Sequence, residues 1–197
     1  MAPTRTTLAD LVAEAAGCRA CDLWRNATQT VFGAGSATAR IVMVGEQPGD
    51  QEDRAGEPFV GPAGRVLDRA LAEAGIERDD VYVTNAVKHF KWTPKGRRRI
   101  HQKPTAREMA ACRPWLEGEL AATDPAVLVL LGATAGQAVF GSKFRVGQAR
   151  GRRLEHDGRT VIATIHPSAV LRAPSGADRD EAYAGLVADL RRARAEL

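Results

Sequence analysis

Four short runs of apolar residues predict the strands of a central sheet. They cover residues 41–44, 81–84, 127–131 and 160–164. Each run is rich in valine, isoleucine or leucine and lacks a regular alternation of apolar and polar positions. This pattern is typical of strands that are covered on both faces, as in parallel sheets.

The segments between these runs have apolar residues at helical spacing and are predicted to be helices. Residues 64–74 place apolar side chains on one face and end at Gly75, a suitable C-cap. A second helix is predicted to begin with a capping box at Thr105 and to run to about Ala122. Two more are predicted over residues 134–140 and 182–194. The alternation predicts an α/β fold, a three-layer αβα arrangement around a four-stranded parallel sheet. We expect residues 1–197 to form a single domain.

The loops that follow the four strands are the expected location of any binding site. Ligands of such sheets bind beyond the carboxyl ends of the strands. The loops cover residues 45–49, 85–89, 132–134 and 166–168. A longer irregular stretch, the basic loop at residues 91–104, is predicted to be inserted between the second strand and the helix at Thr105. Loops of that length inside a domain are usually functional or disordered.

The formal net charge of +4 is modest, but the positive charge is unevenly distributed. No acidic residue lies between positions 88 and 103, whereas seven basic residues do: Lys88, Lys91, Lys95, Arg97, Arg98, Arg99 and Lys103. Such a density suits the replacement of counterions on a phosphate backbone. No apolar run is long enough to span a bilayer, and the features of a signal peptide are missing. We therefore expect a cytoplasmic protein.

The expected site loops contain polar and aromatic side chains that could take part in binding or catalysis. Glu46 and Gln47 lie in a glycine- and proline-bounded turn that could face a ligand or simply be solvated. Phe59 could stack on a base or plug the core. Asn85 offers a donor and an acceptor together, which match the edge of uracil, although asparagine is also common in turns. His166 could stabilise an anionic oxygen or serve a helix entry.

His101 ends the run Arg97-Arg98-Arg99-Ile100-His101. Its basic neighbours favour the neutral imidazole, which keeps a lone pair for use as a nucleophile or base. The alternative is a phosphate contact, the commoner role of a histidine beside arginines.

The three cysteines permit more than one interpretation. Cys18 and Cys21 have the spacing of metal ligands, and Cys112 lies far away in the sequence. An iron–sulfur cluster normally needs four ligands, and zinc with three cysteines and one histidine is its rival. A fourth ligand would come from His89, His101, His156 or His166. Buried, inert thiols are the third reading.

The loop motifs together resemble those of uracil-DNA glycosylases. These motifs are Gly45-Glu46-Gln47-Pro48-Gly49, Pro58-Phe59-Val60-Gly61-Pro62-Ala63-Gly64, Val83-Thr84-Asn85-Ala86-Val87-Lys88 and His166-Pro167-Ser168, in that order. The resemblance is strongest to the iron–sulfur class called family 4, and it runs from about Cys18 to the C-terminal helix.

Three departures from the family 4 pattern indicate the UdgX-type branch of covalent uracil-DNA binders. Gln47 stands where that family usually has alanine, His89 stands where it has cysteine, and the segment from Arg97 to His101 is an insertion. In that branch the histidine that ends the basic loop bonds covalently to the deoxyribose after uracil leaves.

The resemblance implies a role for each site residue. Glu46, His101 and His166 would be catalytic: Glu46 would polarise His101, the nucleophile, and His166 would stabilise the departing uracil. Uracil would be bound by Gln47, Asp50, Phe59 and Asn85. The DNA would be contacted by Lys95, Arg97, Arg98, Arg99, Ser168, Leu171 and Arg172, with Leu171 as a wedge in the vacated stack. A [4Fe–4S] cluster would be held by Cys18, Cys21, Cys112 and His89.

The resulting hypothesis is a single-turnover protein of DNA repair that captures uracil-containing DNA, preferably single-stranded, and acts as a monomer. Two alternatives remain: a conventional multiple-turnover uracil-DNA glycosylase, and a non-catalytic iron–sulfur module that binds nucleic acid through the basic loop.

Overall fold

The computed structural model describes residues 6–197, and its main feature is a five-stranded sheet in the order β2-β1-β5-β7-β6. Four of the strands run parallel: β1 (Ile41–Gly45), β2 (Val81–Asn85), β5 (Val127–Leu131) and β7 (Arg159–Thr164). They are the four predicted strands, and the three-layer α/β arrangement is confirmed. The sheet gains an antiparallel edge strand, β6 (Arg153–His156). Its mixed, largely exposed sequence carries no run of apolar residues that could have predicted it.

Four helices correspond to the predicted ones: α3 (Pro62–Ala74), α4 (Ala106–Thr123), α5 (Ala133–Phe140) and α8 (Gly176–Ala195). Thr105 caps α4 by accepting a hydrogen bond from the backbone N–H of Glu108, and Gly75 ends α3 in the left-handed conformation with φ of 73°. The α8 helix begins earlier than predicted because Ser175 caps it, and its first turns are polar and exposed. The remaining helical segments are short: α1 (Leu8–Ala15), η1 (Asp22–Arg25), α2 (Asp50–Ala55), η2 (Arg78–Asp80), α6 (Val146–Ala149) and α7 (Pro167–Leu171).

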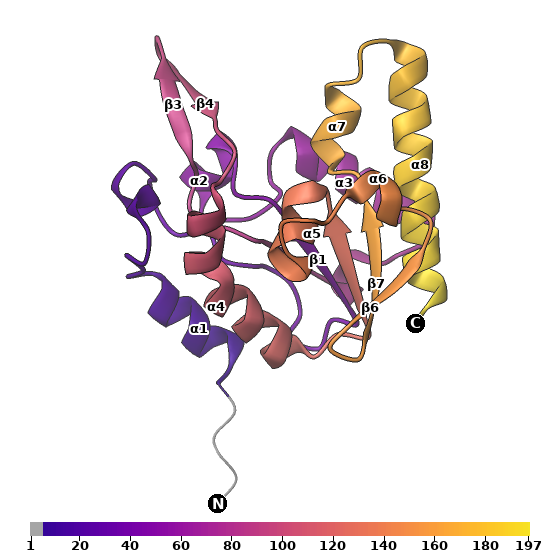
Figure 1. Ribbon diagram of the computed structural model, residues 1–197, viewed down its shortest axis with the longest axis horizontal. Helices are drawn as coiled ribbons and strands as arrows, with labels where there is room; N and C mark the ends of the chain where they lie inside the picture. Colours follow the sequence, from indigo (N-terminus) through magenta and orange to yellow (C-terminus); the bar gives the residue numbers. More distant parts are fainter. Residues whose placement is uncertain (1–5) are drawn as a thin grey trace, which may run out of the picture.

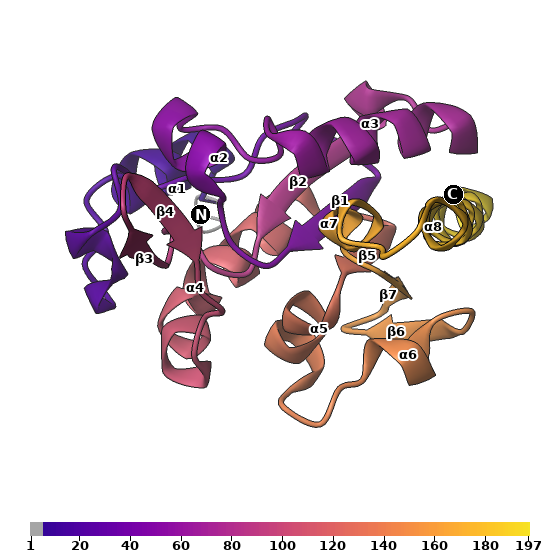
Figure 2. The same cartoon turned by 90° about the horizontal axis from the view of Figure 1, so that it is seen from above.

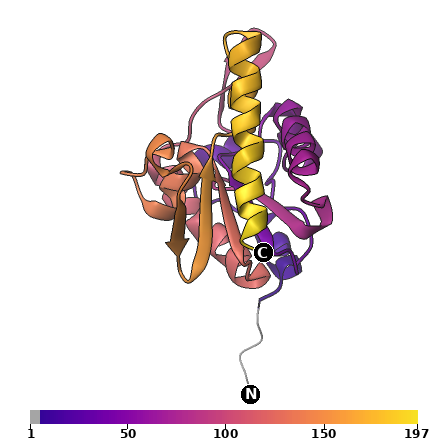
Figure 3. The ribbon, with the colours of Figure 1, turned by 90° about the vertical axis from the view of Figure 1, so that its right-hand side faces the viewer.

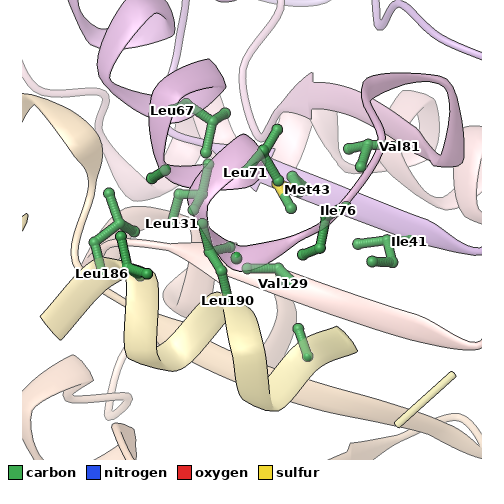
Figure 4. Packing of buried hydrophobic residues seen from close by; sticks show 14 of the residues in the cluster. Ile41, Met43, Leu67, Leu71, Ile76, Val81, Val129, Leu131, Leu186 and Leu190 are labelled. Atoms are coloured by element: carbon green, nitrogen blue, oxygen red, sulfur yellow. The ribbon is translucent and has the colours of Figure 1, made fainter. Parts of the chain in front are cut away.

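Successive residues of the central strands pack against opposite helical layers. Ile41 and Met43 of β1 join the core cluster that contains Leu71 of α3 and Leu190 of α8, and Figure 4 shows this packing at close range. Intervening residues such as Val42 join a second cluster on the other face, with Leu116 and Leu120 of α4. Figure 2 shows α3 and α8 on one side of the sheet and α4 and α5 on the other. Burial on both faces explains why the strand sequences do not alternate.

The sequence predicts that the basic loop is irregular. The structure shows instead that it contains a β-hairpin. Strand β3 (Trp92–Lys95) pairs antiparallel with β4 (Arg98–His101), and the two form a sheet of their own. Gly96 adopts a φ of 60° at the first of the two turn positions, as a type II′ hairpin turn requires. The hairpin projects from the body of the molecule opposite the corner between α7 and α8 (Figure 1).

The strand order places the crevice of the sheet between β1 and β5. The chain turns from β1 toward β2 on one side, whereas β5 and β7 continue on the other. Ligands of open α/β sheets bind at such switch points. The α8 helix runs along the flank of the sheet and leads from the hairpin end of the molecule to its opposite end (Figure 3). Within residues 6–197, no helix is sufficiently long and apolar to cross a membrane.

Candidate active site

A cleft of about 910 Å³ opens at the carboxyl ends of the parallel strands. All four predicted loops contribute to it, together with the end of β4 and helix α7. The side chains most relevant to chemistry along its wall are Glu46, Gln47, Asp50, Phe59, Asn85, His101, Thr134, His166, Ser168, Leu171 and Arg172. The sequence-predicted catalytic residues therefore meet in one cleft, although they come from three different elements.

Glu46 and His101 lie in direct contact in this cleft. Glu46 Oε1 is 3.3 Å from His101 Nε2, and Glu46 Oε2 accepts a short hydrogen bond from the hydroxyl of Thr134 at the start of α5. The His101 side chain is 48% exposed. Partial burial lowers the pKa of His101, Glu46 opposes this effect, and Arg172 adds to it. The result is a neutral imidazole beside a carboxylate, an arrangement that can activate a nucleophile.

Gln47 holds the base of the hairpin that carries His101. Its Nε2 donates to the carbonyl oxygens of Lys91 (3.1 Å) and Gln102 (3.0 Å), and its Oε1 accepts from the backbone N–H of Lys91 (3.2 Å). Both amide protons are thus used on the hairpin backbone. Gln47 lines the cleft as expected, but its hydrogen bonds indicate a positioning role for it rather than the expected contact with uracil.

Arg99 fastens the hairpin to α2 instead of facing a phosphate. Its guanidinium pairs with Asp50 and lies 2.5 Å from Asp53, which is 0% exposed. Arg99 itself is only 13% exposed and lies over the rings of Phe90 and Trp92. The expectation that Arg99 contacts DNA does not fit this geometry, because a largely covered guanidinium that already pairs with two carboxylates has little surface left for a phosphate.

The other basic residues of the hairpin are exposed. Lys95, Arg97 and Arg98 surround its turn, outside the cleft lining. They have the accessibility that the expected phosphate contacts require. Asp50, expected to bind uracil, reaches the cleft lining but also pairs with Arg99 and Arg54, and these pairs lower the pKa of its carboxyl.

Phe59 is held in a backbone conformation that side chains seldom adopt. Its φ is 59°, which is costly for a bulky residue and persists only where the surroundings enforce it. Glu52 braces this loop by accepting hydrogen bonds from the N–H groups of Gly61 (2.8 Å) and Gly49 (3.1 Å). The ring of Phe59 stacks near that of His166, with centroids 6.0 Å apart. The loop thus presents one aromatic face to the cleft.

Asn85 is fixed at the bottom of the cleft. It is 3% exposed, and the segment after it is tied to the Glu46 loop by the hydrogen bonds Ala86 N–H to Gly45 O and Val87 N–H to Glu46 O, both 3.0 Å. A Cβ atom at Gly45 would lie 2.4 Å from Asn85 Oδ1 and 2.7 Å from the ring of Phe59. Glycine is therefore required there for the carboxamide and the ring to meet.

His166 presents a hydrogen-bond donor to the cleft. Its Nδ1 accepts from the backbone N–H of Ser168 (3.1 Å), so in the neutral ring the proton lies on Nε2. Burial, Arg172 and His101 together lower the pKa of His166 to about 4. The Arg172 guanidinium donates to Ser168 Oγ (2.8 Å), which lies 2.7 Å from Nδ1. A neutral Nε2–H can donate to an oxygen that becomes anionic.

The cysteines lie where the segment around η1 packs against α4. Cys21 and Cys112 lie in one apolar cluster with Leu23 and Val87, and Cys18 Sγ accepts a hydrogen bond from Trp115 Nε1 (3.2 Å). The contact with Cys112 lowers the pKa of Cys21 to about 6. Within residues 6–197, no three histidine, cysteine or acidic side chains are arranged as a closed metal site.

His89 is buried in the same region with an unpaired ring nitrogen. It is 3% exposed, its Nε2 lies 3.1 Å from Thr30 Oγ1, and its Nδ1 has no hydrogen-bond partner. Burial lowers the pKa of His89, which keeps both a lone pair and a neutral ring. A buried polar atom without a partner is uncommon, and a bound water or ion would satisfy it.

Several residues that shape the site were not predicted from the sequence. Thr134 lies in one of the predicted loops, but nothing in the sequence distinguishes its hydroxyl from that of any helix-starting threonine. In the sequence, Glu52 and Asp53 look like acidic residues of a polar helix, because Gly61 and Arg99, their respective partners, lie outside that helix. Only three-dimensional proximity identifies them.

Comparison with known proteins is consistent with the geometry. Residues 32–191 match the family described as the uracil DNA glycosylase superfamily. A type-4 uracil-DNA glycosylase from Thermotoga maritima is 43% identical over 172 residues, which are 86% of each chain. Another, from Archaeoglobus fulgidus, is 40% identical over 176 residues, 85% of each chain. A type-5 uracil-DNA glycosylase from Pyrobaculum aerophilum is 34% identical over 151 residues, 68% of this chain and 63% of that protein.

Proposed function

Because the chain belongs to the uracil-DNA glycosylase superfamily, we propose that it excises uracil from DNA and then bonds covalently to the deoxyribose through His101. The observation that carries the second half of this proposal is the contact between Glu46 and His101 inside the cleft. Base recognition and sugar capture would then be carried out by different residues of one cleft.

Uracil would be recognised after it has been flipped out of the DNA, since a cleft at the sheet's edge cannot reach a stacked base. Phe59 would stack on the flipped ring. Asn85 would pair with an acceptor and a donor on its edge, as a carboxamide can. The constrained backbone of Phe59 and the burial of Asn85 support these roles, because both side chains are held ready before the base arrives.

Cleavage of the glycosidic bond would be assisted by His166. As the bond between C1′ and the base nitrogen breaks, its electron pair leaves on uracil. The Nε2–H of His166 would donate to the uracil oxygen on which that negative charge develops. The low pKa of His166 supports donation from the neutral ring.

Capture would follow at the sugar. A lone pair of the neutral His101 ring would form the new bond to C1′, which carries positive charge once uracil has left. Glu46 would accept the proton that the imidazole must lose, so that the adduct is neutral at the ring. Gln47 and Arg99 would be positioning residues for the hairpin, because their hydrogen bonds fix its base and its flank.

The DNA strand would cross the mouth of the cleft between the hairpin and α7, both of which contribute residues to the cleft lining; Figure 1 shows the two elements apart at the same end of the molecule. Lys95, Arg97 and Arg98 would contact phosphates on the hairpin side. On the other side lie Ser168, Arg172 and the exposed Leu171, which has the size and position of a wedge. A single strand is the preferred partner in this proposal.

A [4Fe–4S] cluster held by Cys18, Cys21, Cys112 and His89 is also part of the proposal. The adjacent thiols of Cys21 and Cys112 and the unpaired Nδ1 of His89 support it. When bound, the cluster would cross-link the N-terminal segment, the loop after β2 and α4. Iron content and visible absorbance of protein purified without oxygen would test it, with Cys112→Ser expected to lose both. Zinc in place of iron would contradict the cluster.

One experiment tests the main proposal. The protein is mixed in excess with a uracil-containing single-stranded oligonucleotide, and the products are separated on a denaturing gel. We expect a shifted band that survives denaturation, that is lost in His101→Ala and that persists in the control His156→Ala, whose histidine lies on β6. Abasic product without a shifted band would establish the conventional glycosylase instead. Neither product would leave a nucleic-acid-binding module.

A further inference from the structure

A buried ion pair lies behind the cleft, beyond the carboxyl end of β2. Lys88 and Glu119 are each 0% exposed, and Lys88 Nζ is 2.5 Å from Glu119 Oε2. Neither belongs to the described cleft lining. Removing two charges from water is costly, and a well-packed apolar pair often stabilises a fold equally well. Stability is therefore a poor explanation for this pair, and its geometry has to be considered.

The ammonium group of Lys88 has three partners for its three N–H donors. These are Thr84 Oγ1 at 2.6 Å, the carbonyl oxygen of Asn85 at 2.8 Å and Glu119 Oε2 at 2.5 Å. An ammonium group has no further donor, so this arrangement uses its full capacity. One of the three partners is the peptide group of the residue whose side chain faces the base.

Glu119 in turn fixes the place of the ammonium group. Its Oε1 accepts from the hydroxyl of Tyr82 (2.9 Å), from Thr84 Oγ1 (2.8 Å) and from the backbone N–H of Gly33 (3.0 Å). A carboxylate on α4 thus collects donors from β2 and from the segment beside it. Because Glu119 is held at several points, Lys88 Nζ has one position available.

The peptide after Asn85 is restrained from the opposite side as well. The N–H of Ala86 donates to Gly45 O, while the carbonyl oxygen of Asn85 accepts from Lys88. Both ends of the 85–86 peptide unit are therefore bonded. A rotation of this unit would carry the Asn85 carboxamide away from the plane of the base, and hydrogen bonds weaken steeply with such misalignment.

We infer that Lys88 is a positioning residue for uracil recognition. It holds the peptide of Asn85 so that the carboxamide meets the uracil edge, and Glu119 holds Lys88. The inference rests on the proposed function, in which Asn85 reads the base. It assigns the buried pair to specificity, and it predicts that Lys88 acts through Asn85 and not independently of it.

A double-mutant cycle tests this dependence. Lys88→Met and Glu119→Gln are introduced together so that no buried charge is left unpaired, and single-turnover uracil excision is measured. We expect a loss of about tenfold or more in the parent background, and less than about twofold in the Asn85→Ala background. Equal fold losses in the two backgrounds would overturn the inference, because a purely structural effect does not require Asn85.

A milder variant serves if the double substitution does not fold. Thr84→Val removes the hydroxyl that bridges Lys88 and Glu119 but leaves both charges in place. Its smaller loss should also vanish in the Asn85→Ala background. Thr164→Val is the matched control, since Thr164, the last residue of β7, also donates to a buried carboxylate, that of Asp189 on α8 (2.7 Å). Its effect should be equal with and without Asn85.

The two levels of the proposal fail differently. If the unmodified protein releases no uracil, the proposed function is refuted, and this inference with it. If the unmodified protein releases uracil and the Lys88 and Thr84 losses are independent of Asn85, only the inference is refuted.

Discussion

Replacing Gln47 with alanine separates two roles that a residue of this cleft could have. Gln47 is 7% exposed, and the substitution removes three hydrogen bonds to the backbone at the base of the hairpin, at 3.0 to 3.2 Å. If Gln47 positions His101, the variant should still release uracil but should capture the DNA poorly. If it reads the base, both steps should suffer together.

The magnitude follows from those three bonds. Each neutral hydrogen bond contributes about 1 kcal/mol net, so about 3 kcal/mol of hairpin anchoring is at stake. Each 1.4 kcal/mol that is lost from the transition state for capture corresponds to about a tenfold lower rate. Because water will replace part of the lost bonding, we expect the covalent adduct to form about 10- to 100-fold more slowly, with uracil release changed by less than about threefold.

The assay follows both products in one reaction. Under single-turnover conditions, free uracil is quantified from a radiolabelled base, and the adduct from a denaturing gel. Gln51→Ala is the matched control, because Gln51 is an exposed residue of the same cleft lining. An unchanged ratio of adduct to released uracil in Gln47→Ala, with both slowed, would refute the positioning role and support direct base contact.

Three further predictions concern neighbouring contacts. Thr134→Val removes the hydroxyl that donates to Glu46, and a lost hydrogen bond to a charged group should slow adduct formation about tenfold or more; Thr134→Ser should restore most of the rate in the same gel assay. Arg99→Met leaves the fully buried Asp53 without its cation and should lower the free energy of unfolding by about 3 kcal/mol or more, measured by urea denaturation. Arg97→Met at the exposed turn should change the free energy of unfolding by less than about 0.5 kcal/mol. Equal losses in the two variants would contradict the conclusion that Arg99 anchors the hairpin. His166 has a folded-state pKa of about 4 against an ordinary value of 6.5, so protonation favours the unfolded chain, and stability should fall as the pH drops from about 6.5 toward 4. The loss attributable to His166 should approach about 3 kcal/mol and be missing in His166→Asn; identical pH profiles would show that the ring is not protected.

The central sheet could be predicted because its strands have a local signature. Burial on both faces makes residues 41–44 and 127–131 apolar throughout, and the caps at Thr105 and Gly75 are short-range patterns. The same holds for the site loops, whose place follows from the end of each strand. Features that are determined by residues close together in the sequence could therefore be predicted from it.

The hairpin and its anchoring were not accessible in this way. Its residues are largely exposed, so no apolar pattern reveals β3 or β4, and its stabilising contacts reach across the chain. Arg99 meets Asp53, and Gln47 meets Lys91 and Gln102. From sequence, an arginine in a basic run is read as a phosphate contact and a glutamine in a site loop as a ligand contact. Only the folded arrangement shows that Gln47 binds the backbone at the base of the hairpin and that Arg99 pairs with α2.

The strands of the hairpin pair with each other and not with the central sheet, so the proposed nucleophile lies on a separate structural unit. Side chains of the body that hold the hairpin include Glu46, Gln47, Asp50 and Asp53. The residues proposed to recognise the base lie outside the hairpin. Residues 91–104 and those four side chains could be grafted onto a glycosylase of the same superfamily that lacks the hairpin. The graft should convert a multiple-turnover enzyme into a protein that reacts once and stays bonded to the DNA. An enzyme and a covalent label for uracil in DNA would then differ by one small, exchangeable module.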